Sequence, residues 1–316
     1  GNLVPRDVAS RAAKERCDKG YGVNNTGLAV FLDFSEAINR LGKDVVAQRY
    51  GNLFDMYEEI TDVSPYENPM MIYPAIHYTM GGIWVDYELM TSIKGLFAIG
   101  ECNFSDHGAN RLGASALMQG LADGYFVLPY TIQNYLADQI TVPRFSTDLP
   151  EFAAAEKAVQ DKIDWMMNIK GKKSVDSIHK ELGHIMWEYV GMGRTAEGLK
   201  EGLKKLKEVR KEFEKELFIP GDKEGMNVEL DKAIRLYDFI TMGELVAYDA
   251  LNRNESCGGH FREEYQTEEG EAKRDDENYF YVACWEYQGS DEKEPVLLKE
   301  PLVYEAIKVQ TRNYKS

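Results

Sequence analysis

One stretch in the first half of the chain brings together side chains that could bind an anion beside a flat ligand. His77 lies just before the glycine pair Gly81–Gly82, and glycines let a ligand approach the backbone closely. Glu101 follows an apolar run, and Arg111 lies in a glycine-framed loop that opens a helical segment. A guanidinium can bind a carboxylate through two hydrogen bonds, and a helix N-terminus adds partial positive charge. The combination indicates an anion site, although each residue alone fits an ordinary glycine-rich turn with a satisfied histidine and a surface arginine.

A second glycine motif resembles a nucleotide-binding loop but lies in the wrong context. Residues 191–196, GMGRTA, fit the G-x-G-x-x-A form of the dinucleotide fingerprint. That motif binds a pyrophosphate when a strand leads into the glycine turn. Here the preceding residues, 181–190, belong to a helical stretch. The sequence therefore predicts a break between two helices and no phosphate loop of this type.

The composition narrows the class of protein. A length of 316 residues predicts two or three lobes, and a net charge of −16 argues against nucleic acid as a partner. The five histidines and four cysteines are scattered without CxxC or HExxH spacing, so we expect no metal site and reduced thiols. The longest apolar runs, such as Met70–Ile76, are far shorter than the ~20 residues of a membrane-spanning helix. The N-terminal residues do not form a signal peptide, and a first residue other than Met suggests a processed or truncated chain.

The elements around the candidate site change in character along the chain. Residues 1–70 predict a helix at Val8–Lys19, a strand at Leu28–Phe34 and a helix near Gly42–Ile60. Beyond them, up to residue 130, short apolar runs separated by glycines predict a sheet, followed by a helix at Ala114–Leu128.

The rest of the chain predicts helices and then strands. In residues 150–256, the apolar positions of Ala196–Leu217 recur every three or four residues, and a second long helix starts near Asn227, which is typical of an antiparallel bundle. The remainder predicts a small β-rich lobe. Its expected strands lie at Tyr279–Tyr287, between Pro295 and Pro301, and at Ala306–Tyr314.

Three motifs together resemble one enzyme family. HYTMGG at residues 77–82, GE at 100–101 and HGANRLG at 107–113 resemble, in this order, the flavoprotein subunits of succinate dehydrogenase and fumarate reductase. PRDVASR at residues 5–11 is similar to an upstream motif of that family. GHFREEY and RDDEN near the C-terminus are similar to its last domain. L-aspartate oxidases share much of the first motifs, so an L-aspartate oxidase-like flavoenzyme is one alternative, and a non-catalytic helical docking module is another.

The resemblance implies an α+β multi-domain fold. Residues 1–70 would be the remainder of a capping (substrate) domain, and residues 71–133 the C-terminal segment of an FAD-binding α/β domain. Residues 134–256 would form the helical bundle domain, and residues 257–316 the C-terminal β-rich domain.

The resemblance also implies roles for the substrate-site residues. Arg6 would be the catalytic residue that exchanges a proton with the methylene carbon of succinate, while hydride passes to or from flavin N5. An arginine stays charged because its pKa exceeds ~12, so a relay would have to support it, and an ion pair between Arg6 and Asp7 is the local alternative. His77 and Arg111 would bind the two carboxylates of the substrate, whereas His107 would shape the loop.

The cofactor implied is FAD. Glu101 would accept hydrogen bonds from the ribityl hydroxyls, and the backbone N–H groups of Ala116 and Leu117 would face the N1/C2 edge of the flavin. Many family members have N-S-L where this chain has Ser115, Ala116 and Leu117, so a side-chain bond at position 116 is lost.

Other parts of the implied assembly lie outside this chain. The ADP-binding half, the covalent attachment histidine and further substrate residues would lie upstream of residue 1, so we expect the isolated chain to be inactive. The implied partners are succinate or fumarate, an iron–sulfur subunit and a cytochrome b membrane-anchor subunit. The implied location is peripheral, at the cytoplasmic face of the inner membrane.

Overall fold

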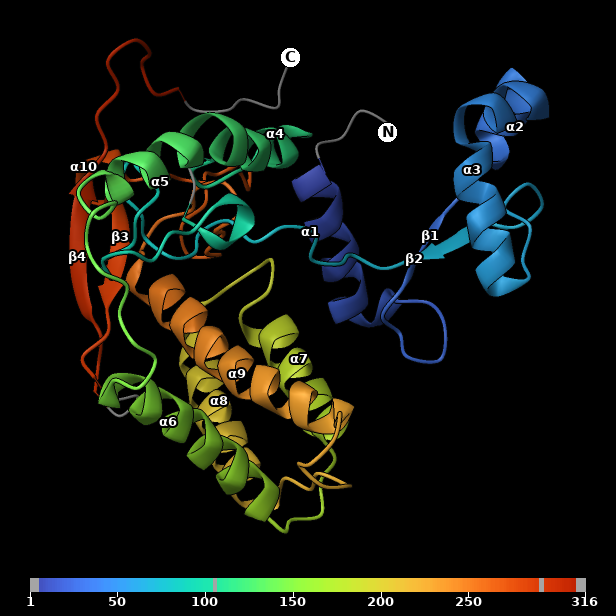
Figure 1. Cartoon of the computed structure of the whole chain (residues 1–316). Coiled ribbons are helices and arrows are strands. Elements are labelled where there is room, and N and C mark those ends of the chain that lie inside the picture. Colours follow the sequence, from blue (N-terminus) through green and yellow to red (C-terminus); the bar gives the residue numbers. More distant parts are fainter. Residues whose placement is uncertain (1–5, 105–106, 290–292, 311–316) are drawn as a thin grey trace. The chain divides into compact units, whose positions relative to one another are not determined.

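The computed structural model describes residues 6–104, 107–289 and 293–310. The described residues form two compact units, one ending at His77 and one comprising Tyr78–Gln310. Among them the fold is mostly helical, with two small antiparallel sheets (Figure 1). The predicted domain boundaries stay predictions.

The first unit is a small helical body with one two-stranded sheet. Its elements are α1 (Arg6–Arg16), a π-type turn (Cys17–Tyr21), β1 (Val30–Leu32), α2 (Ser35–Leu41), α3 (Lys43–Thr61) and β2 (Met70–Ile72). Phe54 of α3 is fully buried, and the rings of Phe34 and Tyr66 contact it edge-on. Because α3 is amphipathic, these aromatic contacts hold its apolar side against the sheet end at Met70.

The predicted elements of this unit are confirmed with shifted ends, and one helix was missed. The two predicted helices correspond to α1 and α3, and the predicted strand is the shorter β1, which pairs with β2. The unpredicted α2 is short and begins where Asp33 Oδ1 accepts the Ser35 N–H (2.8 Å). Gly42 then separates α2 from α3 with a positive φ of 88°, which glycine adopts without strain.

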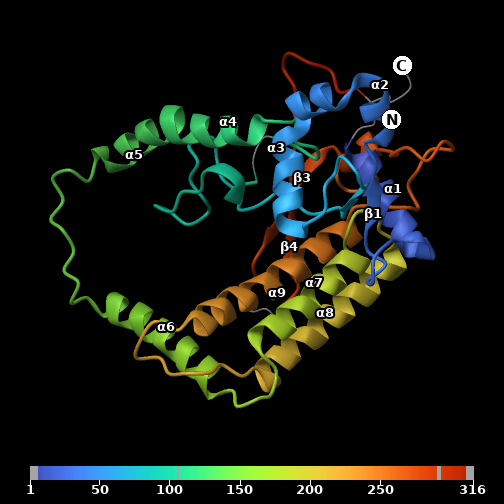
Figure 2. The same ribbon diagram turned by 90° about the vertical axis from the view of Figure 1, so that its right-hand side faces the viewer.

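The second unit contains the remaining elements. They are a 3-10 turn η2 (Gly100–Cys102), α4 (Ser115–Ala122), a π-type turn η3 (Asp123–Val127), α5 (Leu128–Ala137), α6 (Pro150–Asn168), α7 (Val175–Tyr189), α8 (Ala196–Glu216), α9 (Val228–Asn252), α10 (Asp276–Tyr279), β3 (Tyr281–Glu286) and β4 (Val296–Pro301). Figure 2 shows α7, α8 and α9 side by side.

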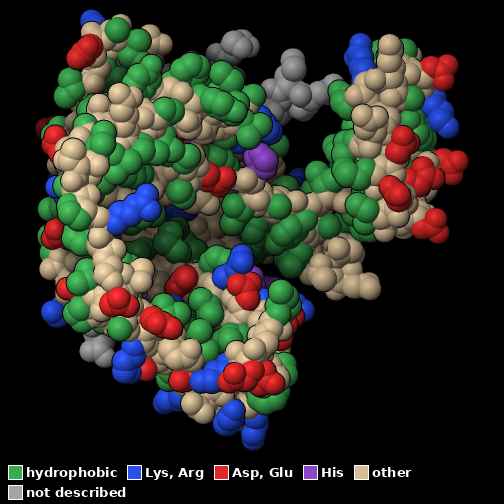
Figure 3. All heavy atoms as spheres, in the orientation of Figure 1, with side chains coloured by type: hydrophobic (Ala, Val, Ile, Leu, Met, Phe, Trp, Pro, Cys, Tyr) green, Lys and Arg blue, Asp and Glu red, His purple; other side chains and the backbone are tan. Residues whose placement is uncertain are grey.

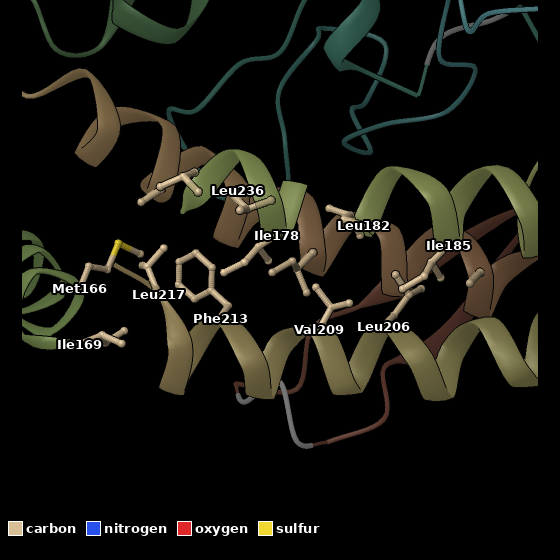
Figure 4. Packing of buried hydrophobic residues seen from close by; sticks show 14 of the residues in the cluster. Met166, Ile169, Ile178, Leu182, Ile185, Leu206, Val209, Phe213, Leu217 and Leu236 are labelled. Atoms are coloured by element: carbon tan, nitrogen blue, oxygen red, sulfur yellow. The ribbon is translucent and has the colours of Figure 1, made fainter. Parts of the chain in front are cut away.

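The helical bundle forms the main core, as the spacing of apolar residues predicts. Leu206, Val209 and Phe213 of α8 are buried against α7 and α9, and Met166 of α6 joins the same cluster (Figure 4). Three helices of the bundle begin with a side-chain cap. The acceptors are Ser174 for α7, Thr195 for α8 and Asn227 for α9.

The motif at residues 191–196 is a break between helices, as predicted. Helix α7, rather than a strand, precedes it, and α8 follows. Arg194 in this turn donates its backbone N–H to Phe261 O (3.0 Å) and accepts the Glu263 N–H (2.8 Å). The turn thus joins the bundle to the segment that follows α9.

The sheet predicted for residues 70–130 is not formed. After β2, the described residues of this region contain only isolated bridges, such as Ile83 with Asn103 and Met90 with Phe97. A strand needs a partner along its length, and after β2 the apolar runs that predicted the sheet make only single bridges among the described residues. The predicted helix at Ala114–Leu128 is confirmed as α4 and η3, and α5 continues it to Ala137.

The C-terminal strands are confirmed in part. β3 and β4 pair in antiparallel register, with Tyr281 opposite Pro301. Trp285 of β3 donates its Nε1–H to Asp249 Oδ1 of α9 (2.7 Å), which ties the hairpin to the bundle. The predicted last strand is wrong for residues 306–310, which are irregular, and residues 311–314 lie outside the described part of the chain.

Candidate functional site

Arg111 is held by an aromatic ring and a thioether in the second unit. Its guanidinium lies over the Tyr78 ring, with 4.7 Å from Cζ to the ring centroid, within the range of a cation–π contact. The His107 ring contacts the Tyr78 ring edge-on, with 5.6 Å between the two ring centroids. The Arg111 backbone N–H points to Met80 Sδ (3.1 Å). The side chain is therefore fixed in direction before any ligand binds.

The same arginine keeps an unused donor. Arg111 Nη1 donates to Leu112 O (3.1 Å), whereas Nε is buried and has no hydrogen-bond partner among the described residues. The Tyr78 hydroxyl is in the same state. Buried donors normally have partners, because leaving one unpaired costs about 1–3 kcal/mol. The unpaired Arg111 Nε marks a place where a ligand with acceptor oxygens would relieve this cost.

Glu101 lies in a turn that residues 78–80 connect to the arginine loop. Glu101 Oε1 accepts the Thr79 N–H (2.9 Å), and the side chain stays exposed. Thr79 follows Tyr78 directly, so one short backbone segment contacts both Glu101 and Arg111. The carboxylate keeps acceptor capacity for hydroxyl groups of a ligand.

A buried carboxylate holds the Glu101 turn against α4. Asp123 Oδ2 accepts the Gly100 N–H (3.1 Å), the Gln119 amide (2.6 Å) and the Asn103 amide (3.3 Å). Gly100 has a φ of 68° and packs close to Gly120, which lets the turn approach the helix backbone. Sequence reasoning missed Asp123, although an acid within an apolar helical run was a signal.

The N-terminus of α4 is open. Its N-cap, Ala114, has a left-handed φ of 65° and forms no side-chain capping hydrogen bond. The N–H groups of the first turn, which include those of Ala116 and Leu117, lack intrahelical acceptors in any α-helix. Together with the helix dipole, they favour a negatively charged group at this end.

The predicted site residues are divided between the two units. Glu101, Arg111, Ala116 and Leu117 lie together in one continuous part of the second unit, whereas Arg6 and His77 belong to the first. Arg6 begins α1 and is exposed, and Asp7 pairs with Arg11 (3.6 Å). The meeting of Arg6 and His77 with the second group stays a prediction.

The described residues offer little further chemistry. Within the described ranges, no group of three or more His, Cys, Asp or Glu side chains could hold a metal ion. The four cysteines are free. As far as the structure describes the chain, none of its helices has both the length and the apolar character that crossing a membrane requires.

Two family patterns match the chain. The family described as "Fumarate reductase flavoprotein C-term" matches residues 179–314, and the one described as "FAD binding domain" matches residues 1–117. The second match agrees with the geometry, because Glu101 and the first residues of α4 lie within it. The chain belongs to the succinate dehydrogenase and fumarate reductase flavoprotein family, as its motifs predict.

Individual relatives agree with this family. The succinate dehydrogenase flavoprotein subunit of Bacillus subtilis is 33% identical over 266 residues, which cover 84% of this chain and 44% of that protein. The fumarate reductase flavoprotein subunit of Escherichia coli is 32% identical over 283 residues, with shares of 88% and 44%. A structure of the quinol fumarate reductase of E. coli superposes with a TM-score of 0.81 at 27% identity, covering 97% of this chain and 50% of that one. The chain thus spans about half the length of these relatives.

Proposed function

We propose that this chain is part of an FAD-dependent enzyme that interconverts succinate and fumarate. The observation that carries the proposal is Arg111, fixed over Tyr78 with its Nε buried and unpaired, beside the Glu101 turn and the open end of α4. A carboxylate that accepts from Nε would remove the cost of the unpaired donor. Family membership supports this reading of the geometry.

The chain's own residues would share the work on a dicarboxylate. Arg111 would bind one carboxylate in a fixed direction, and His77 would donate an imidazole N–H to the other. Arg6 would exchange a proton with the methylene carbon of the substrate. Since a guanidinium stays protonated at ordinary pH, a neighbouring relay must return the proton after each turnover.

The residues of the second unit fit an FAD, which supplies hydride transfer when bound. Glu101 would accept hydrogen bonds from ribityl hydroxyls, because its carboxylate is exposed beyond its bond to Thr79. The N–H groups of Ala116 and Leu117 would face the pyrimidine edge. The dipole of α4 would stabilise negative charge on that edge and so raise the reduction potential.

An exposed apolar face favours the presence of a further segment of the flavin domain that would cover it. Large hydrophobic side chains gather over α4, η3 and α5 (Figure 3), where Leu117 of α4 is 79% and Phe126 of η3 is 75% exposed. A patch of this kind usually contacts another surface. We infer that an ADP-binding segment packs here, and that the chain alone neither holds FAD firmly nor turns over. On the separate ground of family membership, we propose that an iron–sulfur subunit and a cytochrome b membrane anchor receive the electrons, at the cytoplasmic face of the inner membrane.

The test uses the chain joined to an upstream flavin-binding half. We expect succinate or malonate to change the flavin absorbance, and Arg111→Ala to abolish this change while FAD stays bound. Arg144→Ala, at an exposed arginine of the same unit, is the matched control. The proposal is wrong if Arg6→Ala, His77→Ala and Arg111→Ala all leave succinate turnover intact, as a non-catalytic docking module requires. Aspartate oxidation with oxygen, in place of succinate turnover, would instead identify an L-aspartate oxidase.

A further inference from the structure

The loop that carries Arg111 contacts a segment of the same unit that lies far from it in the sequence. Gly259 donates its N–H to Ala109 O (2.8 Å). The neighbouring Gly258 has a φ of 59°, and a Cβ added there would lie 2.2 Å from the same oxygen. Only glycine fits so close to this carbonyl, so the two loops are in direct backbone contact.

Met80 lies between Gly259 and the backbone of Arg111. A Cβ added at Gly259 would lie 2.8 Å from Met80 Cε, and Met80 Sδ is the atom to which the Arg111 N–H points (3.1 Å). Two backbone groups near Arg111 therefore depend on the position of Gly259. They are the Ala109 carbonyl and the Arg111 N–H.

The position of Gly259 is set by a tight turn ending in His260. Cys257 and His260 exchange backbone hydrogen bonds of 2.8 and 3.0 Å. The His260 imidazole is tied on both sides. Arg194 Nη1 lies 2.7 Å from Nδ1, and Arg253 O lies 2.9 Å from Nε2. A guanidinium can only donate, so Nδ1 accepts and Nε2 carries the proton that is donated to the carbonyl.

Both partners of His260 belong to the bundle. Arg194 lies in the turn between α7 and α8, and Arg253 is the C-cap of α9. Arg194 Nε also donates to Val190 O (2.9 Å) and Gly191 O (3.0 Å) at the end of α7. Burial and the nearby Arg194 lower the pKa of His260 to about 4, so the ring is neutral near pH 7 and keeps its acceptor.

We propose that His260 is a positioning residue through which the helical bundle fixes the Arg111 loop for the dicarboxylate. The inference rests on the proposed function, because it assumes that Arg111 binds a carboxylate. It assigns the bundle a part in substrate affinity, transmitted from Arg194 and Arg253 through His260 and Gly259 to Ala109.

The experiment measures malonate affinity in the full-length flavoprotein with bound FAD. The dissociation constant comes from the flavin difference spectrum, and KM and kcat for succinate are measured beside it. We expect His260→Leu to raise the malonate Kd about tenfold, the equivalent of one hydrogen bond to a charged donor, with a larger change in KM than in kcat. His179→Leu is the matched control, because His179 is exposed on α7 and its ring contacts that of Phe239 at a tilt.

If His260→Leu does not fold, two milder substitutions that each keep one of the hydrogen bonds of His260 still test the proposal. His260→Asn retains an acceptor for Arg194, and His260→Gln retains a donor for Arg253. We expect both to raise Kd less than leucine does. Arg194→Leu combined with His260→Leu should raise Kd no further than either change alone.

Three results bear on the two proposals separately. If all His260 variants bind malonate as the wild type does, even with lowered melting temperatures, His260 has only a structural role and the inference is wrong. If His179→Leu raises Kd as much as His260→Leu, the effect is general destabilisation and the inference is again wrong. If the wild-type flavoprotein shows no spectral response to malonate or succinate, the proposed function fails and this inference fails with it.

Discussion

The stacking of Arg111 on Tyr78 allows a test that separates a ring from a hydroxyl. The guanidinium Cζ lies 4.7 Å from the ring centroid, and Arg111 Nε is buried. A cation–π contact is worth about 0.5–1 kcal/mol at exposed sites and about 2 when desolvated. Because the Tyr78 ring is half-buried, its contact with Arg111 should contribute about 1–2 kcal/mol. This energy corresponds to roughly 5- to 30-fold in malonate affinity.

The perturbation is Tyr78→Leu compared with Tyr78→Phe in the full-length flavoprotein. Leucine removes the ring, so we expect the malonate Kd to rise by that factor. Phenylalanine keeps the ring and removes a hydroxyl that has no partner among the described residues, so we expect a change within about twofold. The assay is a flavin difference titration with malonate. Tyr287→Leu, at an exposed tyrosine beyond β3, is the control.

Two outcomes would refute this reasoning. Equal losses for phenylalanine and leucine would mean that the hydroxyl, and not the ring, acts on the ligand. An unchanged Kd for both variants would mean that Arg111 is positioned by its other contacts, or that it does not bind the dicarboxylate.

Further predictions concern stability and the flavin turn. Since the folded-state pKa of His260 is lowered to about 4, its contribution to stability is complete above its ordinary pKa of 6.5 and is lost as the pH falls from 6.5 toward about 4. Urea unfolding at neutral and at acidic pH should show a shallower loss for His260→Gln. Asp123→Ala should cost about 1–3 kcal/mol and weaken FAD retention, with Asp123→Asn in between, as melting curves and flavin stoichiometry would show. Phe213→Ala in the bundle core should cost about 3–5 kcal/mol in urea unfolding, and Phe218→Ala, at a side chain 47% exposed, much less.

The helical bundle could be predicted from the sequence because the signals for each helix lie within that helix and at its ends. Apolar residues of α8 recur at helical spacing, and Thr195 and Asn227 are typical N-caps just ahead of α8 and α9. The prediction of a sheet in residues 70–130 was wrong because a sheet depends on contacts between distant segments. Apolar runs beside glycines, such as the one at Ile83, resemble strands, but a strand is defined by partners that a single run does not contain.

The site was readable only for residues inside motifs. Arg111 and Glu101 stand in recognisable segments, whereas the role of Tyr78 depends on a ring meeting a guanidinium far along the chain. The contact between Gly259 and Ala109 joins residues near opposite ends of the second unit, and no periodicity or spacing predicts such a pair. The motifs therefore predict groups that would face a ligand, whereas the residues that hold those groups in place emerge only from the structure.

The uncovered apolar side chains of α4 and α5 also affect how the chain behaves in solution. They favour self-association, whereas a net charge of −16 makes copies repel one another. Added salt shortens the range of that repulsion to about 10 Å at 0.1 M and leaves the apolar attraction in place. Dilute buffer should therefore keep copies of the chain apart, and concentrated salt should drive them together through α4 and α5.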